Sequence, residues 1–201
     1  MKFSFGQKAS AGPLFCDADG GAVGTWITTY CIRSDWLRPL SHAQDVYVEQ
    51  LKDLYSAEQQ ILKALPKMAK AVTHTELRRA FQEHEVATRT HVERLDSIFA
   101  QLGEKGTGHK CKGMEGLLAE GDELVEEHER SGALDAALIA AAQRVEHYEI
   151  AGYGSVRTFA NMLGFSDHAD LLQRTLDEEG QTDKRLTTLA ETVVNIDAVK
   201  E

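Results

Sequence analysis

The sequence lacks the features that mark membrane-spanning and secreted proteins. No run of apolar residues approaches the roughly 18–20 that a spanning helix requires. Lys2 and Lys8, near the start, precede no sustained apolar segment, so a secretory signal is not expected. The three cysteines, Cys16, Cys31 and Cys111, are odd in number and widely spaced, which argues against a disulfide framework. We therefore expect a cytoplasmic protein without a membrane partner.

Positive charge is also scarce. The 201 residues include 22 basic and 32 acidic side chains, which gives a formal net charge of −10, and no basic cluster stands out. This balance argues against nucleic acid and against an anionic membrane surface as partners. The length is sufficient for one sizeable core. We expect a single domain with an appendage.

The first 41 residues differ from the rest of the chain. They hold two of the three prolines and both tryptophans, Trp26 and Trp36, and they show no helical period. Residues 20–32 (GGAVGTWITTYCI) contain enough β-branched and aromatic side chains for a strand or hairpin. The interpretation that we favour is a poorly ordered N-terminal extension over residues 1–41.

From residue 44 onward, apolar residues recur at spacings of three and four, which is typical of amphipathic helices. Pro66 lies inside the first of these patterns and is expected to kink or end that helix. The domain is expected to span residues 42–195, followed by a frayed tail over residues 196–201. The helices are expected at about 44–72, 75–102, 133–163 and 167–193, with a shorter acidic helix at 113–130 in the long connection.

Each long helical pattern is apolar at its ends and polar in its middle. Burying an ionised carboxylate costs roughly several kcal/mol unless a cation or strong hydrogen bonds compensate it. The inner faces therefore carry groups that need counter-charge. The polar interruptions are Glu58 in the first helix, His84, Thr88 and His91 in the second, Glu146 and Glu149 in the third, and Glu179 and Asp183 in the fourth.

The spacing of these residues predicts that they meet at one height. Glu58 and Thr88 lie 15 residues on either side of a turn near residue 73, and Glu149 and Glu179 lie 15 residues on either side of Gly164. Antiparallel helices rise equally, by about 1.5 Å per residue, so equal separations give equal heights. The long connection allows the second hairpin to join by a crossover. We predict an all-α, ferritin-like antiparallel four-helix bundle with a long crossover that contains a shorter helix.

Five carboxylates and two imidazoles in one dry volume cannot all keep their usual charges unaided. Two divalent cations would offset four negative charges, and mixed carboxylate and imidazole ligands suit iron, manganese or zinc. Alternatively, several carboxylates share protons and have raised pKa values. Any one of these residues, taken alone, is more simply explained as a polar side chain that fixes the register of the helices, or as a core side chain whose hydrogen bonds are satisfied.

Four segments carry a resemblance to a known family. Over about residues 42–195 the chain resembles the YciE/YciF-like family of the ferritin-like superfamily. The resemblance implies a compact helical homodimer, associated with bacterial stress responses, with a dimetal-type site in each bundle. The matching segments are DLYSAEQQILKALPKMA (53–69), KCKGMEGLLAEGDELV (110–125), DAALIAAAQRVEHYEIAGYG (135–154) and LDEEGQTDKRLTTLA (176–190).

The sequence departs from the usual ferritin-like ligand set, which has a lone Glu on the first and third helices and Glu-x-x-His on the second and fourth. Glu179 is followed by Asp183 at i+4 instead of a histidine at i+3, and the second helix has no glutamate on its inner face. We expect Glu149 and Glu179 to bridge the metals, and His84 to be the imidazole ligand. The residues expected to bind metal are Glu58, His84, Glu146, Glu149, Glu179 and Asp183.

These observations support two functional hypotheses. The first is a ferritin-like dimetal-carboxylate stress-response protein that oxidises Fe(II) with O2 or peroxide, as a di-iron oxidoreductase of the ferroxidase or peroxidase type. Two iron ions are the expected cofactor, with manganese or zinc as alternatives. The second hypothesis is a non-catalytic dimeric stress protein with a structural or vestigial metal site. The sequence leaves open whether the protein is an enzyme, and it assigns no catalytic residue.

Overall fold

The chain folds into long helices. The computed structural model describes residues 42–200, and within that range it contains no strand. This confirms the predicted all-α class. The N-terminal extension, including the strand considered for residues 20–32, lies outside the described residues. The helices are α1 (Ala43–Ala71), α2 (Thr75–Leu102), α3 (Lys112–Glu127), α4 (Gly132–Met162), α5 (Ser166–Leu189) and the short α6 (Asn195–Ala198).

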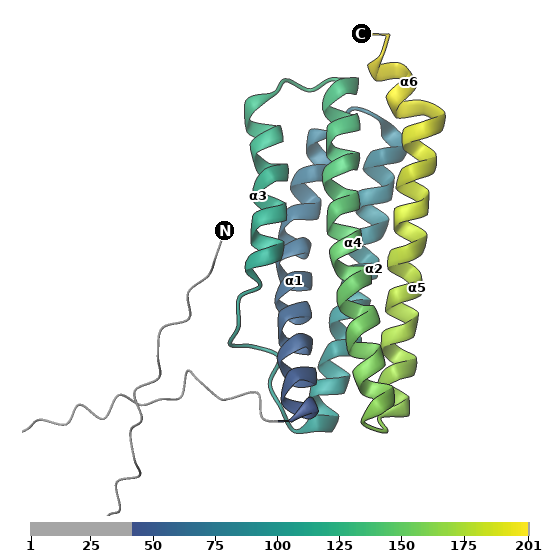
Figure 1. Cartoon of the computed structure of the whole chain (residues 1–201). Helices are drawn as coiled ribbons and strands as arrows, with labels where there is room; N and C mark the ends of the chain where they lie inside the picture. Colours follow the sequence, from purple (N-terminus) through teal and green to yellow (C-terminus); the bar gives the residue numbers. More distant parts are fainter. Residues whose placement is uncertain (1–41, 201) are drawn as a thin grey trace, which may run out of the picture. The chain divides into compact units, whose positions relative to one another are not determined.

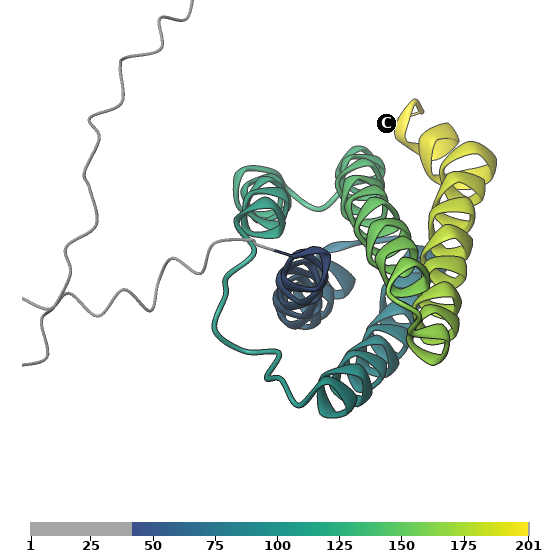
Figure 2. The same ribbon diagram turned by 60° about the horizontal axis from the view of Figure 1, so that its bottom comes forward.

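Two antiparallel hairpins form the bundle. α1 packs along α2, and α4 packs along α5 (Figure 1). The hairpins join because α1 also contacts α4 and α2 also contacts α5. The crossover helix α3 lies outside this square, against α1 and α4, as the view towards the bundle end shows (Figure 2). The predicted ferritin-like arrangement with a helix-containing crossover is therefore confirmed.

The helix ends are set by a few local residues. α2 ends at Gly103, whose φ of +68° is the left-handed conformation that glycine adopts without strain. Gly164, with a φ of +80°, makes the turn between α4 and α5 in the same way. At the start of α4, the hydroxyl of Ser131 accepts a hydrogen bond of 3.1 Å from the backbone N–H of Leu134.

A buried carboxylate on α4 ties down the turn between α1 and α2. Asp135 accepts hydrogen bonds from the backbone N–H groups of Thr73 and His74, at 2.9 and 2.8 Å, and from the hydroxyl of Thr73, at 2.7 Å. These bonds satisfy donors that the short turn leaves without helical partners. The two hairpins are thus joined at this end of the bundle by hydrogen bonds as well as by packing.

Two details differ from the sequence expectations. The alternative that α1 ends at Pro66 is wrong, because the helix continues to Ala71. Proline removes only one backbone donor, and buried neighbours on both sides, Leu65 and Ala69, hold the helix against the core. The expected tail is helical to Ala198, where a π-helical turn over Ala190–Val194 leads into α6.

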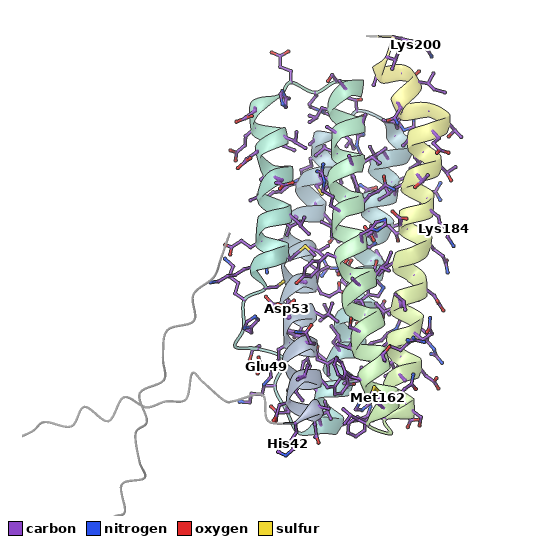
Figure 3. The ribbon with its side chains drawn as sticks, in the orientation of Figure 1. His42, Glu49, Asp53, Met162, Lys184 and Lys200 are labelled. Atoms are coloured by element: carbon purple, nitrogen blue, oxygen red, sulfur yellow. The ribbon has the colours of Figure 1, made fainter. Side chains whose placement is uncertain are left out.

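The core consists of two apolar clusters that the polar residues of the bundle centre separate. One cluster includes Leu65, Phe81 and Leu138, and the other includes Leu51 and Leu95. Charged side chains such as Lys184 lie on the outside (Figure 3). Among the described residues, every helix is too short or too polar to cross a bilayer.

Candidate metal centre

All four long helices contribute buried polar side chains to the middle of the bundle. Glu58, Thr88, Glu149 and Glu179 have no solvent exposure, which confirms that the equal spacings about the two turns place them inside. The polar layer is enclosed by the apolar clusters above and below it. Its full set is Glu58 on α1, His84, Thr88 and His91 on α2, Glu146 and Glu149 on α4, and Glu179 on α5.

The potential ligands form two groups that share one residue. In each group, one ligand atom per residue lies within 4.8 Å of every other, which is close enough for a common cation. Glu179, whose carboxylate has two oxygen atoms, belongs to both groups. The first group is His84, Glu146, Glu149 and Glu179, and the second is Glu58, His91 and Glu179.

Short contacts link the imidazoles to the carboxylates. His91 Nδ1 lies 2.8 Å from Glu179 Oε1 and 3.4 Å from Glu58 Oε1. His84 Nε2 lies 3.3 Å from Glu146 Oε1. All of these side chains are at most a few per cent exposed. Each histidine therefore presents a ring nitrogen to the interior of a different ligand group.

Many carboxylate oxygens in the cluster have no hydrogen-bond donor. Both oxygens of Glu149, one oxygen of Glu58 and one of Glu146 are buried without one, and of the two Glu179 oxygens only Oε1 has a positively charged neighbour, His91 Nδ1. Leaving a buried acceptor unsatisfied costs about 1–3 kcal/mol, and more for a charged group. A divalent cation would satisfy several of these oxygens at once. The donor set of carboxylates and imidazoles thus fits a pair of transition-metal ions.

The pKa shifts of the buried glutamates also indicate that the cluster has too few positive charges for its carboxylates. Burial raises the pKa of Glu58, Glu146 and Glu149, and nearby carboxylates add to the rise. Burial would also raise the pKa of Glu179, but the adjacent His91 lowers it. In the metal-free protein Glu58, Glu146 and Glu149 therefore hold their protons more tightly than free carboxyl groups do.

The two histidines differ in charge. Burial lowers the pKa of His84. Burial would lower the pKa of His91 as well, but its contacts with Glu179 and Glu58 outweigh it and raise the value to about 10. His84 is therefore a neutral imidazole, the form that binds metals, whereas His91 in the metal-free protein is a cation.

Partners outside the cluster fix the orientation of His91. Its Nε2 shares a hydrogen bond of 2.9 Å with Glu178, and Arg94 donates to both carboxylate oxygens of Glu178 at 2.6 and 2.8 Å. The Glu178 side chain is 39% exposed, so this chain of contacts leads from the cluster to the surface. Such a carboxylate behind a ligating imidazole sets its tautomer and its ring orientation.

Tyr153 completes the surroundings of Glu58. Its buried hydroxyl donates to Glu58 Oε1, whereas Glu58 Oε2 has no hydrogen-bond partner. The two oxygens of this carboxylate are thus differentiated, since one is held by the protein and the other is available. Tyr153 is therefore both a fully buried core residue and a hydrogen-bond partner of Glu58.

Asp183 lies beside the cluster and belongs to neither ligand group. Its side chain is 21% exposed, and its Oδ1 accepts a hydrogen bond of 2.9 Å from Gln143. His147 has an exposed side chain, and its Nε2 lies 3.4 Å from the same oxygen. The other five residues expected to bind metal all fall in the two groups.

Two residues that the sequence expectations did not include as ligands or ligand partners have clear places. His91 joins the second ligand group, and its position on the inner face of α2 was the signal for it. Glu178 has no comparable signal, because it lies off the inner face and contacts the site only through His91.

Comparison with known proteins assigns the family. A family model described as a domain of unknown function, DUF892, matches residues 42–199. The chain belongs to the DUF892 family. The match covers the whole bundle, and the predicted relationship to YciE/YciF-like proteins is confirmed by the relatives of this DUF892 chain.

Protein YciF of Escherichia coli strain K12 is 46% identical over 153 residues, which cover 76% of this chain and 92% of the relative. The crystal structure of that stress protein superposes with a TM-score of 0.74, covering 77% of this chain and 98% of the other at 45% identity. YcfI from Rhodopseudomonas palustris gives a TM-score of 0.72 at 41% identity, with 75% and 96% covered.

A more distant match concerns the fold alone. A two-domain protein from Anabaena variabilis, which contains a ferritin-like domain, is 19% identical with a TM-score of 0.53. The match covers 77% of this chain and 38% of that protein. The DUF892 bundle thus shares the ferritin-like fold.

Proposed function

We propose that the buried cluster binds two divalent metal ions, iron above all, and that the protein acts in the stress response of a bacterial cell by oxidising Fe(II) with O2 or hydrogen peroxide. The observation that carries this proposal is the pair of ligand groups that share Glu179. The unpartnered carboxylate oxygens add independent support. The relationship to YciF, a stress protein, supplies the biological setting.

The residues divide between the two cation positions. Glu58 and His91 would hold one cation, and His84, Glu146 and Glu149 the other, with Glu179 between them. Glu149 belongs to one group only, so Glu179 is the better supported of the two expected bridges. Asp183, hydrogen-bonded to Gln143, would act on the site through Glu146 rather than as a ligand.

Iron supplies the Fe(II)/Fe(III) couple that reduces the oxidant. The protein contributes a site that excludes water, since the ligand side chains are almost fully buried. Tyr153 donates a hydrogen bond to one oxygen of Glu58, and this bond fixes the direction in which the other oxygen points. Glu178 holds the ring of His91 by accepting a hydrogen bond from its Nε2, and Arg94 holds Glu178 in place by donating to it.

A second function is favoured by one specific observation. His91 is already a buried cation between Glu58 and Glu179, so the cluster is partly neutralised without metal. This supports a non-catalytic stress protein whose metal site is structural or vestigial. A structural site predicts that chelation lowers the melting temperature strongly, because metal that binds only the folded state stabilises it by mass action. A vestigial site predicts no effect of chelation.

The test begins with metal analysis of full-length protein purified without chelators. We expect close to two ions per chain, and fewer than one in a Glu179→Ala variant. Glu120→Ala, which removes an exposed carboxylate from α3, is the matched control and should keep both ions. Fe(II) added without oxygen, followed by peroxide, should then be oxidised faster by wild type than by Glu179→Ala. Equal oxidation rates would refute the oxidase function, and failure of the wild-type protein to hold metal would refute the site.

The proposal includes a homodimer in the cytoplasm, as the YciE/YciF-like resemblance implies. Sedimentation equilibrium at micromolar concentration should give twice the chain mass of 22.2 kDa. A monomer at these concentrations would remove the dimer from the proposal without affecting the metal site, whose ligands all come from one chain.

A further inference from the structure

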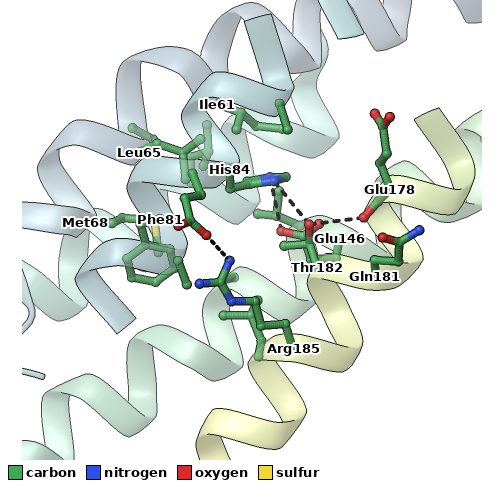
Figure 4. A pocket seen from close by; sticks show the side chains of 18 residues that line it. Ile61, Leu65, Met68, Phe81, His84, Glu146, Glu178, Gln181, Thr182 and Arg185 are labelled. Atoms are coloured by element: carbon green, nitrogen blue, oxygen red, sulfur yellow. Dashed lines mark hydrogen bonds and ion pairs between the residues drawn. The ribbon is translucent and has the colours of Figure 1, made fainter. Parts of the chain in front are cut away.

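A cavity opens beside the metal cluster and is not explained by metal binding. Its volume is about 270 Å³, and it lies between α1, α2, α4 and α5, with Leu118 of α3 at one side. Eleven of its eighteen lining residues are apolar. Figure 4 shows Ile61, Leu65, Met68 and Phe81 on one side of this pocket.

Most polar groups of the pocket come from α5, and the others from α2 and α4. His84 and Glu146, both members of the first ligand group, form the buried end (Figure 4). The outer end lies between α2 and α5, where Arg185 donates to Glu83 across the opening. The pocket therefore connects the surface with one side of the cluster through an apolar passage.

The size of the pocket exceeds what O2 or peroxide requires. A cavity of about 10–15 Å³ on this measure holds one water molecule, and an apolar cavity of about 150 Å³ accepts benzene. The 270 Å³ available here would hold a fused pair of rings or a short branched hydrocarbon. A passage for a diatomic gas needs no such width.

The charges of the pocket select against anions. The buried end faces carboxylates that lack donors, which would repel an anionic ligand. The acids at the mouth are neutralised by their own partners, Glu83 by Arg185 and Glu178 by Arg94, so they offer little to a cationic ligand. An uncharged molecule is disfavoured at neither end, and one N–H or O–H group on it could donate to the unpartnered Glu146 Oε2.

We infer that this pocket is a binding site for a small, uncharged, largely apolar molecule of about the size of indole, with its inner edge against His84 and Glu146. Binding itself depends only on the pocket. The further consequence, that the bound molecule lies next to a metal ion, rests on the proposed function. The site thus gives the metal centre a neighbouring organic ligand in addition to its oxidant.

Indole is a suitable probe, and methyl NMR of the full-length protein is the readout. We expect saturable shifts at Ile61, Leu65 and Val145, which line the pocket, and none at Leu51 and Leu95 in the other apolar cluster. Shifts that do not saturate, or that are equal in both clusters, would overturn the proposal.

Two substitutions that fill the pocket provide a second measurement. Ala87→Leu on α2 and Ala64→Leu on α1 each add a side chain to its wall, and each should weaken indole binding at least tenfold. Ala100→Leu adds the same atoms to an exposed position of α2 and should leave binding unchanged. Unweakened binding in a folded pocket variant would overturn the proposal. If neither variant folds, the wild-type methyl shifts alone decide the outcome.

Metal loading separates this inference from the proposed function. Mn(II) should broaden the proton signals of indole beyond the effect of Zn(II), because His84 and Glu146 belong both to the pocket and to the cluster. Saturable indole binding without any metal binding would refute the metal function and support the pocket. Metal binding without saturable indole binding would refute the pocket and support the metal function.

Discussion

Replacing Glu149 by glutamine should have opposite effects in the metal-free and metal-loaded protein. Glu149 is fully buried, both of its oxygens lack a donor, and burial together with Glu58, Glu179 and Glu146 raises its pKa. Without metal this carboxyl group destabilises the fold. With metal bound as proposed, it would be a ligand.

The magnitude follows from linkage. A carboxyl group with a raised pKa in the folded state takes up a proton on folding, at a cost of about 1.4 kcal/mol for each pH unit between its unfolded value and the solution pH. With an ordinary value of 4.5, that cost is at most about 3.5 kcal/mol at pH 7. The Glu149→Gln amide must still find acceptors, which its carboxylate neighbours provide. We expect a net gain of about 1–2 kcal/mol in the metal-free protein.

The assay is thermal unfolding followed by circular dichroism. For a chain of this size, about 1 kcal/mol shifts the melting temperature by about 2–4 °C. Metal-free Glu149→Gln should therefore melt about 2–8 °C above metal-free wild type. In excess metal the order should reverse, because the variant loses a ligand and with it part of the stabilisation by bound metal.

The pH dependence provides a further check on the sign. Glu58, Glu146 and Glu149 have raised pKa values, so the stability of the metal-free protein should fall as the pH rises above 4.5. His91 acts in the same direction, since its stabilisation is complete below 6.5 and is lost as the pH rises to about 10. Metal-loaded protein should instead gain stability with pH, because protons compete for the ligands. Destabilisation by Glu149→Gln in both states would refute the reasoning and leave a packing role for this side chain.

Three other predictions concern the surroundings of the site and the fold. Glu178→Gln should weaken metal binding by about 10–100-fold in a competition assay with a chelating dye, and an unchanged affinity would show that this contact is incidental. Asp135→Ala should lower the free energy of unfolding by about 1–3 kcal/mol in urea titrations, because it leaves the backbone N–H groups of Thr73 and His74 without an acceptor. The metal content of this variant should stay at the wild-type value. Gly103→Ala should lower the free energy of unfolding by about 1–2 kcal/mol because of the positive φ at this position. Gly116→Ala, at an exposed position inside α3, should raise it by about 0.5–1 kcal/mol, and equal effects of the two substitutions would contradict this account.

Much of the fold could be predicted because helix formation and helix pairing leave periodic marks in a sequence. The apolar spacing located α1, α2, α4 and α5, and the equal distances of Glu58 and Thr88 from one turn predicted their common height. Short turns enforce antiparallel neighbours, so height along the bundle follows from counting residues. Pro66 was expected to kink or end the first helix, and the second of these alternatives is wrong because tertiary packing holds a helix that local preference alone would interrupt.

The candidate site was only partly predictable. Counting residues gives height and face, but it does not give the direction of a long side chain or the partner that it meets. Asp183 and Glu179 lie on the same side of α5, yet Asp183 turns to Gln143 and Glu179 turns inward. The hydrogen bond between His91 and Glu178 joins residues 87 positions apart, and no local pattern encodes it.

The sequence by itself determined the helices, their pairing and the presence of acids and imidazoles at one level, because these depend on periodicity and on distances along the chain. Only the tertiary structure decided that Glu179 lies between two ligand groups, that His91 is a cation held from outside by Glu178, and that an apolar pocket reaches His84. The physical reason is that contacts and empty space between helices depend on the rotamers and packing of side chains from several helices at once.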